Sequence, residues 1–293
     1  MNLELYQMDV KTAFLNRELD EEIYMDKPLC FESKGQKRKV CKLKRFIYDL
    51  KQASRQWNIK FHHVVLKDGF KMMEEDHCMY LKCLNNGFVI LSLYVNEILL
   101  AENSKEMIDI AKKWLSSNFE MKHMGEANYV LGVKIVRDRA KRLLALSQET
   151  YIKRMLECYH MQDSKPMDTP VDKSLSLSRD MCPKTPEEKE KMFRVPYANA
   201  VGSLMYAMMY TCPDICYVVG LISRYQSNLR QKHWMAVKRI LRYLKGTSDY
   251  MLCYQGKKDL RLISYSNADW GSDIDQSKST SGYTFLLNDS AIL

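Results

Sequence analysis

Two apolar runs separated by only two polar residues are the feature that most constrains this chain. Residues 88–95 read FVILSLYV, residues 98–101 read ILLA, and Asn96 and Glu97 stand between them. A polar pair between two strand-length apolar runs is typical of the tip of a tight β-hairpin. The sequence therefore predicts an antiparallel sheet that carries a carboxylate at one of its turns.

The remaining patterns mix strands and helices. Apolar residues recur at helical spacing over residues 52–67, 105–119, 148–159, 197–210, 213–227 and 233–245. Strand patterns cover residues 5–15, 79–84, 129–136, 142–147, 250–254, 260–265 and 283–287. This order predicts an α+β fold with an antiparallel sheet. Residues 161–190 hold four prolines and little periodicity, and we interpret them as a linker or a surface-hugging segment.

Charge, hydropathy and cysteine content limit the partners and the cellular location that we expect for the chain. The net charge of +9 and the pI near 8.9 leave two interpretations open at about equal weight, a polyanionic partner or a solvated basic surface. No apolar run approaches the ~18 residues that span a bilayer, so we expect no membrane. The nine cysteines lack zinc-site spacing and the N-terminus lacks a basic signal region, so we expect an intracellular setting, cytoplasmic or nuclear.

The acidic residues alone leave the chemistry open. Asp9 ends a predicted strand and Glu97 stands at the hairpin tip 88 residues later. Two carboxylates brought together from distant strands could hold Mg²⁺, although spacing alone favours two solvated turn residues. No glycine-rich phosphate loop, nucleophile elbow or helical histidine pair is present in the sequence. Seven basic residues lie between Lys34 and Arg45 and could track a nucleic acid.

Ordered motifs along nearly all of the chain resemble copia-type retrotransposon reverse transcriptases. The first two are QMDVKTAFLN at residues 7–16 and KLKRFIYDLKQASRQW at residues 42–57. LYVNEIL at residues 93–99 stands where that family has Tyr-Val-Asp-Asp, and YVLGVKI at residues 129–135 resembles its primer-gripping strand. HWMAVKRILRYLKGT at residues 233–247 and YSNADW at residues 265–270 match the helical region and the opening of the RNase H domain.

The resemblance implies a right-hand polymerase and a division of the chain. It implies a palm with partial fingers over residues 1–160, a linker over 161–190, a helical thumb and connection region over 191–249, and truncated RNase H-like strands over 250–293. The implied partners are an RNA or DNA primer–template and deoxynucleoside triphosphates, and the implied ancestral cofactor is Mg²⁺. The oligomeric state stays open.

The same resemblance implies roles for individual residues. Asp9, Asn96 and Glu97 stand at the catalytic positions, and Asp9 and Glu97 are the expected metal ligands. Phe14, Tyr48 and Lys51 fall in the motifs that line the nucleotide. Lys238, Arg239, Arg242 and Lys245 form one basic helix face, which either binds phosphates or is an ordinary solvated face. Asn267 and Asp269 are the expected remnant of the RNase H site.

Departures from the family pattern predict lost activity. Asn96–Glu97 replaces an Asp pair, which reduces the number of formal negative charges at the site from three to two. Asp49 replaces a glycine beside the nucleotide, Ser54 replaces a proline, and Asn267 replaces the first RNase H aspartate. We therefore expect a fragment of a retrotransposon Pol polyprotein with little or no polymerase activity and weak Mg²⁺ binding at best. The alternative is a non-catalytic nucleic-acid-binding remnant or a domesticated structural protein.

Overall fold

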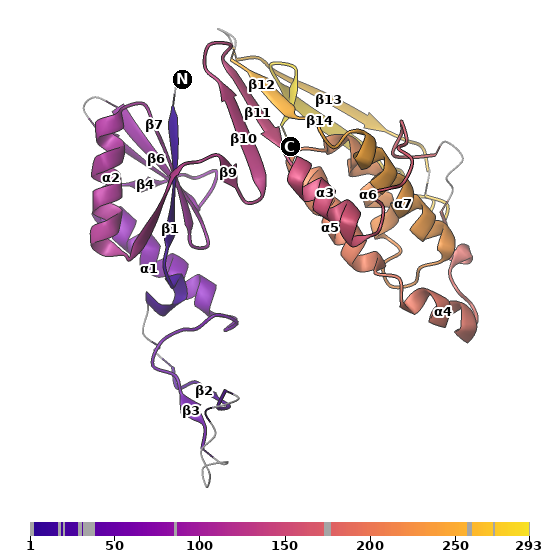
Figure 1. Ribbon diagram of the computed structural model, residues 1–293, viewed down its shortest axis with the longest axis horizontal. Helices are drawn as coiled ribbons and strands as arrows, with labels where there is room; N and C mark the ends of the chain where they lie inside the picture. Colours follow the sequence, from indigo (N-terminus) through magenta and orange to yellow (C-terminus); the bar gives the residue numbers. More distant parts are fainter. Residues whose placement is uncertain are drawn as a thin grey trace. The chain divides into compact units, whose positions relative to one another are not determined.

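The computed structural model describes residues 3–16, 19, 21–28, 31, 39–84, 87–172, 177–256, 260–271 and 273–292. The chain forms two units, residues 1–127 and residues 128–293 (Figure 1). In the described ranges, no helix combines the length and the apolar character needed to cross a bilayer. Of the predicted basic cluster, Lys34, Lys37 and Arg38 lie outside the described residues.

A six-stranded sheet organises the first unit. Its strands, in sequence order, are β1 (Glu4–Val10), β4 (Lys71–Met72), β5 (Met79–Leu84), β6 (Gly87–Tyr94), β7 (Glu97–Glu102) and β8 (Met121–Glu126). The order across the sheet is β4-β5-β6-β7-β1-β8, and every neighbouring pair is antiparallel. The antiparallel sheet and the hairpin predicted from residues 88–101 are confirmed, but the turn is Val95–Asn96 and not Asn96–Glu97, because Glu97 already pairs with Tyr94 as the first residue of β7.

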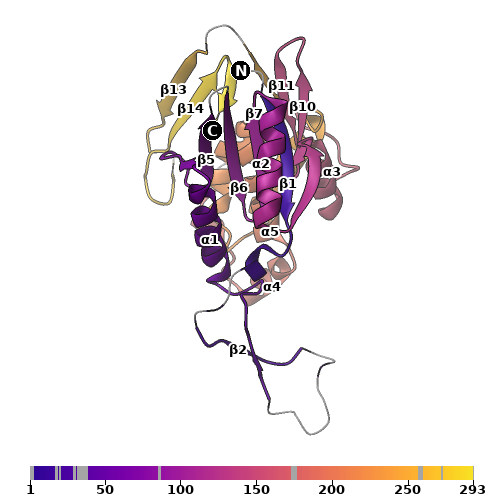
Figure 2. The same ribbon diagram turned by 90° about the vertical axis from the view of Figure 1, so that its left-hand side faces the viewer.

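Two helices, α1 (Ala53–Lys67) and α2 (Lys105–Asn118), cover one face of this sheet. Figure 2 views the unit from the side on which α2 lies in front of β1, β6 and β7. Met8 and Val10 of β1 are buried in the same core as Trp57 and Phe61 of α1. Since side chains alternate along a strand, Gln7 and Asp9 point to the opposite face.

Short elements complete the first unit. The 3-10 helix η1 (Ala13–Asn16) follows β1, and α1 lies against it. The strands β2 (Tyr24–Met25) and β3 (Cys41–Lys42) form a separate antiparallel pair. The predicted strand over residues 5–15 therefore ends at Val10, because Thr12 adopts a left-handed φ of 49° and turns the chain into η1.

The second unit contains two further antiparallel sheets. One has the order β12-β11-β10-β9 and the other the order β13-β14-β15. The strands are β9 (Tyr129–Val130), β10 (Val133–Asp138), β11 (Leu143–Ser147), β12 (Leu252–Gln255), β13 (Leu262–Ala268), β14 (Ser281–Leu287) and β15 (Ser290–Ile292). Strand β12, which we expected among the C-terminal strands, pairs with β11 through Leu252 opposite Leu146 and Tyr254 opposite Leu144.

Helices bury the core of the second unit. They are α3 (Glu149–Cys158), α4 (Pro186–Phe193), α5 (Tyr197–Tyr210), α6 (Cys216–Ser223) and α7 (Gln231–Gly246), with the 3-10 turns η2 (Arg179–Met181) and η3 (Pro213–Ile215). Apolar residues of α3 join those of α5, α6 and α7 in one cluster. The strands and helix over residues 129–159 lie in this second compact unit, whereas the predicted palm and partial fingers over residues 1–160 stay a prediction.

The predicted linker over residues 161–190 is partly ordered structure. It holds η2 and the start of α4, where the Thr185 side chain accepts a hydrogen bond from the Glu188 backbone amide at 3.3 Å. Pro186 occupies the first helical turn, where a missing N–H costs nothing. Residues 164–172 lie along α7 through polar contacts.

Candidate active site

The turn between β6 and β7 is held in an uncommon conformation. Tyr94 pairs with Glu97, so Val95 and Asn96 form a two-residue loop. Val95 has a φ of 55°, which is unusual for a β-branched residue. The buried indole of Trp57 donates a hydrogen bond to the Val95 carbonyl oxygen over 2.6 Å and thereby ties the turn to α1. Local strain of this kind persists where surrounding contacts fix the backbone.

Asp9 and Glu97 lie directly opposite one another on β1 and β7. The Val10 amide donates to the Asn96 carbonyl at 2.8 Å, which makes Asp9–Glu97 a non-hydrogen-bonded pair. Side chains at such a pair approach more closely than at the alternate pairs of an antiparallel ladder. The juxtaposition expected for Asp9, Asn96 and Glu97 is therefore present, whereas their catalytic and metal-binding roles stay predictions.

Each of the two carboxylates accepts a hydrogen bond from a neighbouring amide. The Asn96 side-chain amide donates to Asp9 Oδ2. The Gln7 amide donates to Glu97 Oε2 at 3.1 Å. Gln7 is only 9% exposed, so its side chain is fixed beside the carboxylates and not free to turn into solvent.

One basic residue on β8 and one that directly follows β1 border the site. Lys122 pairs with Asp9 across β8, so its side chain lies on the same face of the sheet as Asp9. The Lys11 ammonium forms an exposed ion pair with Glu120 at 2.8 Å. Positive charge beside Asp9 lowers the negative potential that would attract a cation to this face.

The residues present fit a pair of magnesium ions poorly. Magnesium takes oxygen ligands in a strict geometry, but Asn96 and Gln7 direct N–H donors at the two carboxylates. Within the described ranges, no group of three or more His, Cys, Asp or Glu side chains could hold a metal ion. The site offers two carboxylates where the resemblance implies three.

The residues expected to line the nucleotide lie near one another in the first unit. The rings of Phe14 and Tyr48 are 4.7 Å apart at an angle of 57°. Asp49 follows Tyr48 in a turn and has a φ of 73°, a conformation that favours glycine. Lys51 is exposed and lies just before α1. The turn thus retains a glycine-type backbone although a charged side chain occupies it.

Three of the four basic residues predicted on α7 contact the segment of residues 164–172. Arg239 donates to Asp172 Oδ2 at 2.8 Å and to Thr169 Oγ1 at 3.0 Å. Arg242 donates to the Lys165 carbonyl at 2.5 Å, and Lys245 donates to the Ser164 carbonyl at 2.6 Å. These contacts give Arg239, Arg242 and Lys245 a structural role whether or not they also meet phosphates.

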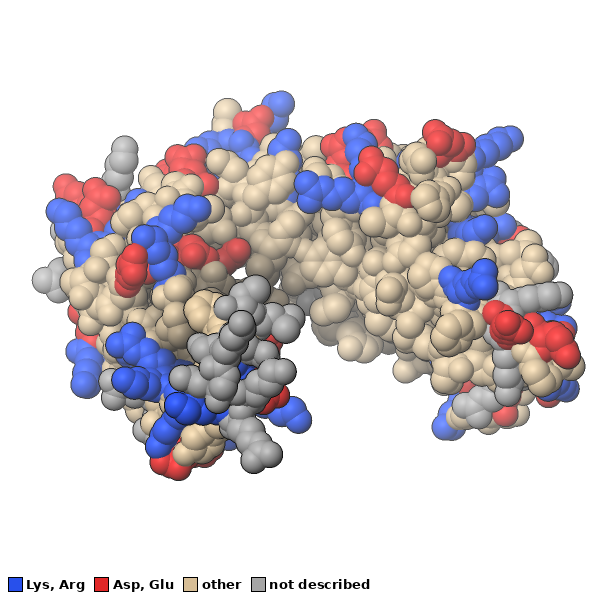
Figure 3. Space-filling model, turned by 60° about the horizontal axis from the view of Figure 1, so that its bottom comes forward, with Lys and Arg blue, Asp and Glu red and all other residues tan. Residues whose placement is uncertain are grey.

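Lys238 is placed differently, because its ammonium lies 5.7 Å from the centroid of the Trp234 ring. On the face of the molecule drawn in Figure 3, Lys and Arg side chains are interspersed with Asp and Glu side chains.

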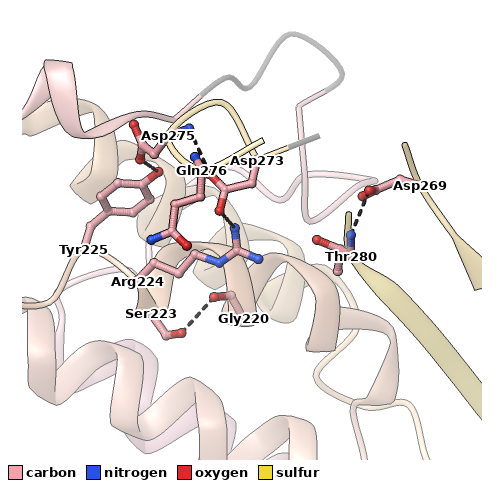
Figure 4. A network of polar contacts seen from close by, with 9 residues as sticks. All are labelled: Gly220, Ser223, Arg224, Tyr225, Asp269, Asp273, Asp275, Gln276 and Thr280. Atoms are coloured by element: carbon pink, nitrogen blue, oxygen red, sulfur yellow. Dashed lines mark hydrogen bonds and ion pairs between the residues drawn. The ribbon is translucent and has the colours of Figure 1, made fainter. Parts of the chain in front are cut away.

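Asn267 and Asp269 line a cavity of about 770 Å³ between α6 and the strands β13 and β14. Asp269 Oδ1 accepts a hydrogen bond from the Thr280 amide at 2.8 Å, and Asn267 Oδ1 accepts one from the Ala268 amide at 2.9 Å. Figure 4 shows Arg224 beside Asp273, with 3.2 Å between Nη1 and Oδ2. Tyr225 likewise donates to Asp275 over 3.2 Å, so the turn that follows β13 is fastened to the end of α6.

Sequence reasoning did not single out Gln7, Trp57 or Lys122 as functional residues. Gln7 could have been found, because it lies two residues before Asp9 and so shares its face of β1. Trp57 closes a recognised motif, but its contact with Val95 joins residues 38 positions apart. Lys122 lies on an exposed edge strand whose polar sequence, MKHMGE, lacks the alternation that indicates a strand.

Comparisons with known proteins agree on one family. A family model described as "Reverse transcriptase (RNA-dependent DNA polymerase)" matches residues 1–173. The chain is 48% identical, over 293 residues and its full length, to the Retrovirus-related Pol polyprotein from transposon TNT 1-94 of Nicotiana tabacum, covering 22% of it. It is 34% identical over 281 residues, 96% of the chain, to the Retrovirus-related Pol polyprotein from transposon RE2 of Arabidopsis thaliana, covering 19% of it.

A shorter relative is covered almost completely. The Putative transposon Ty5-1 protein YCL074W of Saccharomyces cerevisiae is 32% identical over 280 residues, which are 96% of the chain and 89% of that protein. By contrast, the chain spans less than a quarter of the length of the two Pol polyproteins.

Proposed function

The chain belongs to the reverse transcriptase (RNA-dependent DNA polymerase) family and corresponds to a fragment of a retrotransposon Pol polyprotein, and on this premise we propose that it is a polymerase module that binds primer–template but does not extend it with Mg²⁺. Its ancestral reaction is RNA-directed DNA synthesis from deoxynucleoside triphosphates. The setting we propose is intracellular.

In this proposal the first unit is the palm with part of the fingers. The strands β9 and β10 act as the primer-gripping element, and residues 191–249 act as thumb and connection. The strands β13 and β14 are the opening of an RNase H-like domain, with Asn267 and Asp269 at its former acidic positions. The order of the family motifs along the chain supports this division.

One observation carries the proposal. Asp9 and Glu97 form a cross-strand pair on the sheet face opposite α1 and α2, and Asn96 reaches Asp9 from the hairpin turn. Asp9 thus meets Asn96 and Glu97, which follow it by 87 and 88 residues, where a polymerase would gather its carboxylates. Phe14 and Tyr48 lie together in the same unit and would line the nucleotide.

The proposed loss of activity follows from charge. A polymerase stabilises the attacking oxygen and the leaving pyrophosphate electrostatically, and removing one well-placed contact of that kind costs about 10²–10³ in rate. Here one carboxylate is replaced by an amide and another is displaced by one methylene. Asp49 would add a negative charge beside the nucleotide phosphates. We therefore expect a rate below detection in Mg²⁺.

The test is primer extension by the full chain with Mg²⁺ and deoxynucleotides. We compare the unmodified chain with N96D/E97D, with N96D/E97D/D49G, and with D9A as the background. The proposal predicts extension above D9A only in the repaired chains. Mg²⁺-dependent extension by the unmodified chain above the D9A background would overturn it.

A second function is binding without catalysis in any repaired form. Lys122 favours it, because its positive charge on the same face as Asp9 remains after the repair. The two functions separate in one experiment. A binding module shows salt-dependent affinity for primer–template that N96D/E97D leaves unchanged and gains no extension from the repair. Negligible affinity at ~50 mM salt would contradict both functions.

A further inference from the structure

We infer that the side-chain amides of Asn96 and Gln7 take the place of a cation at the Asp9–Glu97 pair, so that this site needs no divalent metal and excludes it. The inference deepens the proposed function and rests on it for the identity of the site. It concerns only contacts within the first unit.

The need for such a substitute follows from the pairing. Two carboxylates at a non-hydrogen-bonded cross-strand pair are close, and like charges facing one another across a ladder destabilise it. A charge on each is tolerated when a donor or a cation compensates it. Asp9 has the Asn96 amide as its donor and Glu97 has the Gln7 amide, so each carboxylate has its own compensating group.

The same contacts oppose a metal ion. To become an oxygen ligand, Asn96 would have to turn its amide, which would remove the donor from Asp9. Gln7 is buried and held against Glu97, so its N–H remains where a cation would approach. Lys122, across β8 from Asp9, adds positive charge on the same face. A divalent cation would therefore have to displace two hydrogen bonds to gain two carboxylates.

Replacing the Asn96 amide with a carboxylate should turn the site into one that binds a divalent cation. In Asn96→Asp the donor to Asp9 is replaced by a third carboxylate, so the site becomes a cluster of three negative charges in which Asp9 has lost its compensating group. Such a cluster destabilises the first unit in the absence of a cation and binds one when it is supplied. By linkage, that binding raises the stability of the folded chain.

The experiment measures the thermal unfolding midpoint of the full chain in EDTA and in 10 mM Mg²⁺. The unmodified chain should shift by less than about 1 °C. N96D should have a midpoint at least about 4 °C lower in EDTA and should regain about 3–6 °C in Mg²⁺. N58D makes the same chemical change on the exposed side of α1 and should be as insensitive to Mg²⁺ as the unmodified chain.

A second readout measures metal binding directly. Free Mn²⁺ is followed by electron paramagnetic resonance during titration, and N96D should bind Mn²⁺ at least tenfold more tightly than the unmodified chain or N58D. If N96D does not fold in EDTA, N96A replaces it, because N96A removes the donor without adding charge. N96A should have a lower midpoint in EDTA than the unmodified chain.

Three results would overturn the inference. They are a saturable Mg²⁺ or Mn²⁺ response of the unmodified chain, an N96D variant as indifferent to metal as N58D, and an N96A variant as stable in EDTA as the unmodified chain. Primer–template affinity is measured in EDTA on the same proteins. Loss of that affinity would refute the proposed function while leaving the metal result standing.

Discussion

The Trp57 indole N–H donates to the Val95 carbonyl over 2.6 Å and so fixes the turn that presents Asn96 and Glu97. Trp57→Phe keeps an aromatic ring but removes the donor. We expect a loss of about 1–2 kcal/mol in the free energy of unfolding, measured by urea denaturation. We also expect faster hydrogen exchange at the Val10 amide, because that amide is bonded to the Asn96 carbonyl.

The control for this change is Trp114→Phe in the same unit. Trp114 stacks on Phe70 with ring centroids 5.5 Å apart. The control should leave exchange at the Val10 amide unchanged. Equal exchange rates at Val10 in both variants would show that the indole hydrogen bond does not fix the turn.

Asp49, like Val95, has a backbone conformation that is unfavourable for its residue type. Its φ of 73° lies in the left-handed region, which costs non-glycine residues about 1–2 kcal/mol. Asp49→Gly relieves that cost but adds freedom to the unfolded chain, so we expect a net gain of about 0.5 kcal/mol in unfolding free energy. Asp109→Gly, inside α2, should instead lose about 1 kcal/mol. A loss of stability in Asp49→Gly would refute this account.

The sequence predicted best those helices and strands whose apolar residues recur at a regular spacing. The hairpin of β6 and β7 has apolar residues on both strands, and α7 has a continuous apolar face of buried residues that includes Val237, Ile240 and Leu241. Strand β8 was missed because both of its faces are largely exposed, so no alternation marks it. Helix α4 was missed although Thr185 and Glu188 have the spacing of a capping box.

The candidate site was predictable at the level of residues and not of contacts. The motif around Asp9 and the polar pair at the hairpin tip indicated which side chains would meet. The direction of the Asn96 and Gln7 amides could not be predicted, because it depends on rotamers and on a strand register between residues about 90 positions apart. The split between the units likewise depends on β11 pairing with β12 more than 100 residues later.

The basic residues of α7 differ in their contacts within the chain. Lys238 is placed over Trp234, whereas Arg239 is bonded to Asp172 and Thr169. Lys238→Ala should lower primer–template affinity and reduce the salt slope by about one, with little effect on stability. Arg239→Ala should lower the unfolding free energy of the chain by about 1–2 kcal/mol, because its contacts to residues 169–172 are lost. The salt slope is measured from affinities at several salt concentrations.

An unchanged salt slope in Lys238→Ala would remove Lys238 from the proposed nucleic-acid surface. Full stability in Arg239→Ala would mean that the contacts to Thr169 and Asp172 contribute nothing measurable. The two variants are controls for each other, since they remove neighbouring positive charges from the same helix.

Glu102 should make the stability of the first unit fall as the pH rises. Its side chain is fully buried at the end of β7. Burial raises the pKa of Glu102 above its ordinary value of 4.5, an effect that the Ile108 backbone amide opposes. The folded state therefore holds the proton more tightly than the unfolded state, and its stabilising effect is complete below about pH 4.5 and is lost as the pH rises through the folded pKa.

Glu102→Gln removes the buried charge and should stabilise the chain at pH 7 by about 1–3 kcal/mol, with the difference vanishing near pH 4. Urea denaturation at pH 4, 5.5 and 7 measures this dependence. The matched control is Glu106→Gln in the first turn of α2, where a negative charge is favourable, so it should cost about 0.3–1 kcal/mol at pH 7. If Glu102→Gln is less stable than the unmodified chain at pH 7, the carboxylate has a compensating contact and the predicted pH dependence is wrong.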